Sequence, residues 1–244
     1  MSLALKIALS PLLVAQGVLT RRRLPRLPEP SGDRHGRVGQ GARLRLLVAG
    51  DSSAAGVGVV TQDEALASQL AAALADACGA CVEWRLLAKS GLTTAQTLQL
   101  LQGEPTLQAE LAVVVTGVND VVDQIPSRRA VSARETLAGW LRREAGVQHV
   151  VFAPLPPIHH FPGLPQPLRW VFGADARRHN AAIARWVRAR RDVSLAEMQM
   201  PLNPEVMAAD GFHPGEPAYR YCAQAIAQHI VAGVWPGLQL ETSP

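Results

Sequence analysis

The chain has 244 residues, of which 48% are hydrophobic and 18% are charged, a composition that is typical of a folded protein and excludes a disordered one. Its length permits one sizeable α/β domain with a buried core and excludes two large domains. The net charge of +4 originates in the first 45 residues, which carry nine Lys/Arg against two Asp/Glu, and only 5% of residues are aromatic, so we expect no binding to nucleic acid.

The N-terminal residues 2–19 form an apolar run that is interrupted by Lys6 and Pro11. The run falls short of the roughly 20 clean apolar residues that a membrane-spanning helix prefers, and it lacks the charge order and cleavage site of a signal peptide. Residues 21–23 are all arginine and, by the positive-inside rule, keep the downstream domain in the cytoplasm. We therefore expect a cytoplasmic protein in which residues 1–26 contact the inner face of the membrane. The alternative is a helix that only packs against the domain.

A strap follows this apolar run. Residues 24–42 are rich in Pro, Gly and Arg and have no hydrophobic period, so they predict a linker or a wrapping strap. We therefore divide the chain into residues 1–42, the apolar segment and the strap, and residues 43–244, the main domain.

The main domain alternates short apolar runs with longer stretches of helical period. The short runs are typical of strands buried on both faces, and they cover residues 44–49, 82–88, 111–116, 149–153 and 192–195. The helical stretches cover residues 64–77, 93–102, 128–144, 174–190 and 218–231. Alternating strands and helices imply right-handed βαβ crossovers and a parallel sheet. The sequence therefore predicts an α/β protein, a three-layer αβα sandwich around a five-stranded, mainly parallel sheet.

A candidate nucleophile, Ser52, follows the first predicted strand. The apolar residues 46–49 run directly into Gly50, Asp51 and Ser52, so the serine stands at the carboxyl edge of the sheet, where α/β folds collect their chemistry. Small neighbours leave its hydroxyl accessible. Since a free hydroxyl is a poor nucleophile, Ser52 needs a base that accepts its proton and a group that orients the base.

The candidate base and its orienting group lie near the C-terminus. Of the seven histidines, only His213 lies three residues after an aspartate, Asp210. One tight turn can present both side chains, with Asp210 accepting from one imidazole nitrogen while the other faces Ser52. The alternative is a turn in which Asp210 only accepts from local backbone N–H groups.

Donors for a developing oxyanion are expected at the ends of the second and third strands. Gly91 follows the second strand and lets a substrate oxygen approach the backbone, and Asn119 follows the third and can offer a side-chain N–H. Taken alone, Gly91 is also consistent with an ordinary turn and Asn119 with a helix cap. Their position at successive strand ends favours a shared site.

Four sequence blocks in this order resemble those of the SGNH (or GDSL) hydrolases: Gly50-Asp51-Ser52-Ser53, Gly91, Gly117-Val118-Asn119-Asp120 and Asp210-Gly211-Phe212-His213. The match spans residue 43 to the end, and Ser53 replaces the usual leucine of the first block. The resemblance implies the flavodoxin-like fold of that family and a catalytic triad of Ser52, Asp210 and His213. It also implies an oxyanion hole formed by the N–H groups of Ser52 and Gly91 and the amide of Asn119.

The resemblance implies a serine esterase or lipase that cleaves small acyl or lipid-like esters through an acyl-enzyme. Such an enzyme needs no metal and no organic cofactor. Two alternatives remain open: an acyltransferase with the same triad, and a membrane-associated binding protein without turnover.

The proline-rich residues 154–167 follow the fourth predicted strand. By that position, we expect this loop and residues 168–172 to wall the acyl or alcohol site. Phe161 and Trp170 are the side chains expected to influence the preferred chain length.

Overall fold

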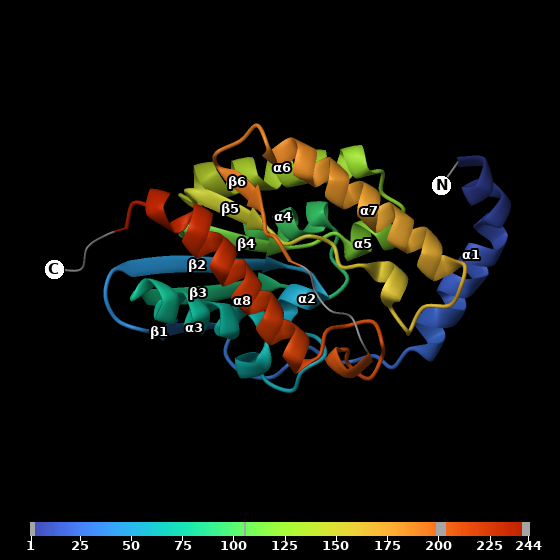
Figure 1. Cartoon of the computed structure of the whole chain (residues 1–244), viewed down its shortest axis with the longest axis horizontal. Coiled ribbons are helices and arrows are strands. Elements are labelled where there is room, and N and C mark those ends of the chain that lie inside the picture. Colours follow the sequence, from blue (N-terminus) through green and yellow to red (C-terminus); the bar gives the residue numbers. More distant parts are fainter. Residues whose placement is uncertain (1–2, 105, 199–203, 241–244) are drawn as a thin grey trace.

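The computed structural model describes residues 3–104, 106–198 and 204–240. In this part of the chain one sheet has the strand order β1-β3-β2-β4-β5-β6 (Figure 1). The strands are β1 (His35–Val38), β2 (Arg43–Gly50), β3 (Cys81–Ala88), β4 (Leu111–Val115), β5 (His149–Phe152) and β6 (Val193–Leu195). All neighbours pair in parallel except β1 and β3. The predicted α/β sandwich and its mainly parallel sheet are confirmed.

The sixth strand, β1, is a difference from the predicted sheet of five. It lies inside residues 24–42 and pairs antiparallel with β3, from His35 opposite Arg85 to Val38 opposite Val82. Its four residues alternate between exposed and half-buried. Because an edge strand of this kind needs no continuous apolar run, the sequence offers no signal for it. The predicted strap therefore contributes one strand to the sheet.

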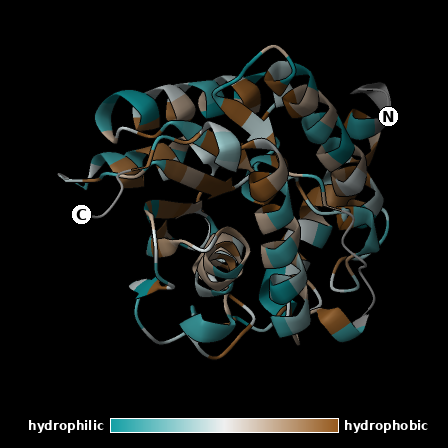
Figure 2. Cartoon of the chain, turned by 60° about the vertical axis from the view of Figure 1, so that its left-hand side comes forward, coloured by the Kyte–Doolittle hydropathy of each residue, from teal (hydrophilic) through white to brown (hydrophobic). Residues whose placement is uncertain are grey.

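Helices cover both faces of the sheet. They are α1 (Leu3–Arg23), α2 (Ser52–Ala55), α3 (Leu66–Cys78), α4 (Thr94–Gln102), α5 (Val118–Val122), α6 (Ser127–Glu144), α7 (Leu168–Val187) and α8 (Glu216–Gly233), with 3-10 turns η1 (Gln62–Glu64), η2 (Ile158–His160), η3 (Pro204–Val206) and η4 (Trp235–Gly237). One core lies between the sheet and α3 and α8, and a second lies between the sheet and α4 and α6. Figure 2 shows apolar segments gathered on the sheet and hydrophilic positions on the surrounding helices.

The helix α7 begins six residues before the predicted residue 174. Leu168 and Val171 are buried, and Leu168 belongs to the apolar cluster beneath this helix, so its first turns are anchored by packing. The N-cap residue is Pro167, which precedes the first turn without interrupting it.

The N-terminal helix α1 lies outside the three layers, against the start of α7 (Figure 1). Lys6 Nζ lies 2.5 Å from Asp175 Oδ2, and the side-chain amide of Gln16 bonds with the carbonyl oxygen of Gln166 and the N–H of Leu168. Among the described residues, no helix combines the length and the apolar character that crossing a membrane requires.

Candidate active site

The turn after β2 positions Ser52. Gly50 ends β2 with a φ of +153°, and a Cβ at this residue would lie 2.0 Å from the carbonyl oxygen of Val115 on β4. Glycine is therefore required for the two strands to approach here. Asp51 then caps α2, because its carboxylate accepts the N–H of Ser53 at 3.0 Å. Ser52 becomes the first residue of α2, at the carboxyl edge of the sheet.

Asp210 and His213 lie in the turn before α8 and face Ser52. His213 Nε2 is 3.0 Å from Ser52 Oγ, and His213 Nδ1 is 2.6 Å from Asp210 Oδ2. The other carboxylate oxygen, Asp210 Oδ1, accepts the N–H groups of Phe212 and His213, each at 2.9 Å. The two expected uses of Asp210 therefore occur together, since one oxygen shapes the turn and the other holds the imidazole.

Two carboxyls near Ser52 have pKa values that shift in opposite directions. Burial alone would raise the pKa of Asp210, but the hydrogen bonds from His213 and Phe212 outweigh it and hold this pKa below its ordinary value. Burial raises the pKa of Asp51 to about 7, although the Ser53 N–H lowers it in part. Asp210 is therefore the carboxyl that stays ionised beside the imidazole at neutral pH.

The three residues expected to supply oxyanion donors, Ser52, Gly91 and Asn119, line the same hollow. Gly91 has a φ of +86°, and no atom lies within 4 Å of the position that a Cβ would take, so this stretch of backbone is open to a ligand. Within the described residues, neither the Ser52 nor the Gly91 backbone N–H has a hydrogen-bond acceptor. Asn119 Nδ2 donates one hydrogen to the carbonyl oxygen of Leu92 at 3.0 Å, which orients the amide and leaves its second hydrogen available.

Two hollows meet at Ser52 and His213. The smaller, of about 420 Å³, is mostly apolar and is lined by Leu66, Val115, Phe161, Tyr219 and Ile226, among others. The larger, of about 860 Å³, extends from the catalytic candidates to α1 and is lined by Val14, Val18, Gly91, Asn119 and Phe172, among others. Both volumes lie within the range of about 300–1,000 Å³ that is typical of small-molecule sites.

The two side chains expected to influence chain length differ in position. Phe161 is 3% exposed and lines the smaller hollow. Trp170 is 41% exposed and lines neither hollow, so the expectation for Trp170 is wrong. Residues 168–172 form the first turns of α7, and the helical period directs Leu168, Val171 and Phe172 to the larger hollow and Trp170 away from it.

Residues 48–221 match the family model of the GDSL-like lipase/acylhydrolase family. The chain belongs to this family. Membership confirms the predicted resemblance to the SGNH (or GDSL) hydrolases, and it makes this GDSL-like protein a carboxylic ester hydrolase of the esterase/lipase type.

Several solved structures have the same fold as this GDSL-like hydrolase. A lipase from a goat rumen metagenome is 18% identical with a TM-score of 0.61, over 76% of this chain and 98% of its own. The carbohydrate acetylesterase Est24 from Sinorhizobium meliloti is 16% identical with a TM-score of 0.55, over 78% and 99%. The psychrotrophic esterase EstA from Pseudoalteromonas sp. is 16% identical with a TM-score of 0.55, over 76% and 96%. No curated protein matches the chain in sequence.

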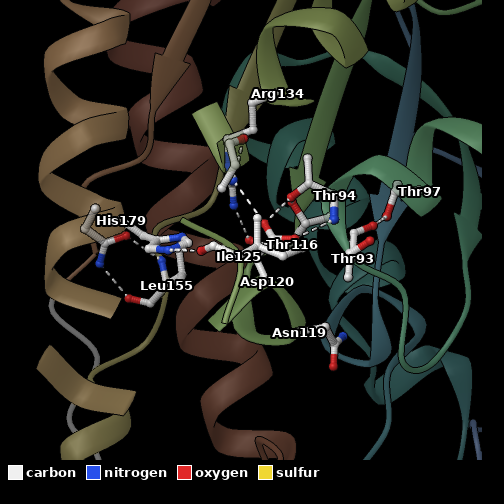
Figure 3. A network of polar contacts seen from close by, with 12 residues as sticks. Thr93, Thr94, Thr97, Thr116, Asn119, Asp120, Ile125, Arg134, Leu155 and His179 are labelled. Atoms are coloured by element: carbon white, nitrogen blue, oxygen red, sulfur yellow. Dashed lines mark hydrogen bonds and ion pairs between the residues drawn. The ribbon is translucent and has the colours of Figure 1, made fainter. Parts of the chain in front are cut away.

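A buried polar network lies next to the candidate oxyanion donor Asn119 of this GDSL-like hydrolase (Figure 3). Asp120, which follows Asn119, accepts the N–H of Thr94 at 2.9 Å and its hydroxyl at 2.6 Å. The fully buried Arg134 of α6 lies 3.2 Å from Asp120 Oδ2 and donates to the carbonyl oxygen of Thr116 at 2.9 Å. The network therefore joins Thr116, directly after β4, and α5, which carries Asn119, to Thr94 at the start of α4, three residues after Gly91.

Replacing Arg134 by Met is expected to lower the free energy of unfolding by about 3–5 kcal/mol, because it leaves the carboxylate of Asp120 buried without its cation. The matched control is Arg142→Met on the same helix. Arg142 pairs with Asp192, but its side chain is 47% exposed, so we expect a loss of at most about 1 kcal/mol. Urea unfolding followed by circular dichroism measures both, and equal small losses would contradict a structural role for the buried pair.

The sequence offers one signal for Arg134 that our interpretation did not use. The neighbours on its face of α6 are Ala130, Leu137, Ala138 and Leu141, all buried at helical spacing. A charged residue in the middle of such an apolar stripe predicts a buried partner. Asp120, the residue after Asn119, is that partner.

Proposed function

We propose that this chain hydrolyses carboxylic esters through an acyl-enzyme on Ser52, with His213 as general base and Asp210 as the group that orients it. The observation that carries the proposal is the unbroken chain of hydrogen bonds from Asp210 through His213 to Ser52, at 2.6 and 3.0 Å. The low pKa of Asp210 supports it further, because an ionised carboxylate stabilises the imidazolium that forms during the reaction.

In the proposed first half-reaction, Ser52 Oγ attacks the ester carbonyl carbon and its proton passes to His213 Nε2. The negative charge that develops on the carbonyl oxygen is stabilised by the N–H groups of Ser52 and Gly91 and by the amide of Asn119. The C–O bond to the alcohol then breaks, and His213 returns the proton to the leaving oxygen.

In the second half-reaction, a water molecule attacks the acyl-enzyme and gives its proton to His213. The carboxylic acid leaves, and the proton returns to Ser52 Oγ. Every proton in the cycle moves through His213, so no metal or organic cofactor takes part in the proposed steps. Product analysis with and without an added alcohol tests hydrolysis against acyl transfer, and we expect the free acid as the main product in both.

We further propose that the smaller hollow receives the acyl chain and the larger one the alcohol. The lining of both hollows is mostly apolar. In the smaller one, Leu66, Phe161 and Ile226 can hold a hydrocarbon chain, whereas the larger one extends from Ser52 to α1 and has room for a bulky alcohol. A lipid-like ester fits this division better than an acetyl ester, because an acetyl group would leave most of the smaller hollow empty.

In a panel of p-nitrophenyl esters, kcat/KM is expected to increase with acyl length up to the point at which the smaller hollow is full. Each buried methylene contributes about 0.8 kcal/mol, or about fourfold in kcat/KM. Phe161→Ala is expected to widen the hollow. The ratio of kcat/KM for the longest ester to kcat/KM for the acetyl ester should then be about tenfold higher than in the wild type.

Trp170→Ala serves as the matched aromatic control, because Trp170 lines neither hollow. We expect its chain-length profile to overlay that of the wild type. A sharp preference for acetyl esters in the wild type, or an unchanged profile in Phe161→Ala, would refute the placement of the acyl chain.

A further inference from the structure

The outer face of α1 is apolar and exposed. Five of the seven large hydrophobic side chains that are exposed in the described residues belong to this helix: Ile7, Leu12, Val14, Val18 and Leu19. The opposite side of the helix is already used, since Leu13 packs on the apolar cluster under α7 and Thr20 is buried. An apolar patch of this kind on a folded protein marks a surface on which something binds.

The charges of α1 indicate what binds there. The helix has no Asp or Glu, and its charged residues are Lys6 and the three arginines at its C-terminal end. Lys6 pairs with Asp175 of α7, whereas the arginines are exposed and follow directly after Thr20. An apolar face that ends in exposed positive charge is complementary to the surface of an anionic bilayer, whose headgroups lie above its acyl chains.

The position of α1 links this face to the proposed chemistry. The larger hollow lies between α1 and Ser52, with Val14, Gly17 and Val18 on one side and Gly91 and His213 on the other. The helix is therefore one wall of the hollow (Figure 1). Val14 and Val18 lie at the border between this wall and the exposed face, and Ile7, Leu12 and Leu19 are exposed without lining the hollow.

We propose that α1 docks the protein on an anionic lipid surface and opens the larger hollow towards the esters that this surface holds. Ile7, Leu12 and Leu19 insert among the lipids, and Arg22 and Arg23 lie at the headgroups. The docking surface depends on α1 alone, whereas the delivery of an ester to Ser52 rests on the proposed function.

The test is co-sedimentation of the full chain with vesicles of equal parts phosphatidylglycerol and phosphatidylcholine. We expect the wild type to bind these vesicles at least tenfold more tightly than vesicles of phosphatidylcholine alone, and binding to weaken as salt is raised. Ile7→Ser/Leu12→Ser/Leu19→Ser is expected to weaken binding at least tenfold. None of these three residues lines either hollow, so hydrolysis of soluble p-nitrophenyl butyrate is expected to stay within about twofold of the wild type.

Two controls isolate the role of the helix. Val60→Ser removes a 75% exposed apolar side chain elsewhere on the surface and is expected to bind vesicles as the wild type does. Arg22→Gln/Arg23→Gln is expected to remove the preference for phosphatidylglycerol. Docking fails if the wild type does not sediment with these vesicles or if the triple variant sediments equally well. A wild type that is dimeric without lipid and becomes monomeric in the triple variant would also overturn it, by assigning the face to a second copy.

Ser52→Ala separates this inference from the proposed function. It is expected to bind vesicles like the wild type while losing hydrolysis. Vesicle binding by a wild type that hydrolyses no ester would support the docking surface and refute the proposed function alone.

Discussion

Ser52→Ala is expected to lower kcat for ester hydrolysis by about 10⁶, the loss that removal of the nucleophile causes in serine hydrolase triads. The reason is geometric. His213 Nε2 is 3.0 Å from the Ser52 hydroxyl. The substitution removes this hydroxyl, so the enzyme loses the group that attacks the ester and whose proton His213 accepts. Activity that remains would come from water and the oxyanion donors alone.

The control for this variant is Ser53→Ala, which removes the neighbouring hydroxyl from the same turn. The backbone N–H of Ser53, which holds Asp51, is kept in this control. We expect kcat to stay within about tenfold of the wild type, because the Ser53 hydroxyl has no part in the proposed chain of proton transfers. Comparable turnover by Ser52→Ala and Ser53→Ala would remove Ser52 as the nucleophile.

Asn119→Ala is expected to lower kcat by about 10²–10³ with little change in KM, because a side-chain oxyanion donor acts mainly in the transition state. The structure adds a specific reason for this magnitude. The Leu92 carbonyl oxygen holds the amide at 3.0 Å, so the donor is oriented before substrate binds. Steady-state kinetics with one soluble ester measures the loss.

Asn119→Asp distinguishes the donor from a packing role. It keeps the shape of the side chain, but a carboxylate has no N–H to offer and repels a developing negative charge. We expect a loss at least as large as that of the alanine variant. A near-normal kcat in either variant, with the free energy of unfolding unchanged, would show that Asn119 does not act on the oxyanion.

The main elements of the fold were predictable because each has a local signal. The parallel strands are continuous apolar runs, and the helices between them have a clear apolar period. The edge strand β1 has no such signal. Its pairing with β3 depends on the turn between β1 and β2, in which Gly39 and Gly41 have positive φ angles. The position of α1 could not be predicted either, because Lys6 and Gln16 find their partners 169 and 152 residues away in the chain.

The candidate site was predictable for a different reason. Ser52, Gly91 and Asn119 all follow strands that turn out to be neighbours in the sheet, so their closeness is a consequence of the parallel topology. His213 follows no strand, and the sequence only suggested that its turn faces Ser52. The buried pair of Asp120 and Arg134 was missed because each partner alone has an ordinary explanation on the surface.

The central claim, that Ser52 is the nucleophile which His213 activates, is tested most directly by labelling with a fluorophosphonate probe and mapping the modified peptide by mass spectrometry. We predict one adduct, on Ser52, which is absent in Ser52→Ala, retained in Ser53→Ala and formed much more slowly in His213→Ala. An adduct on another residue, or no labelling of a folded wild type that binds esters, would contradict the claim.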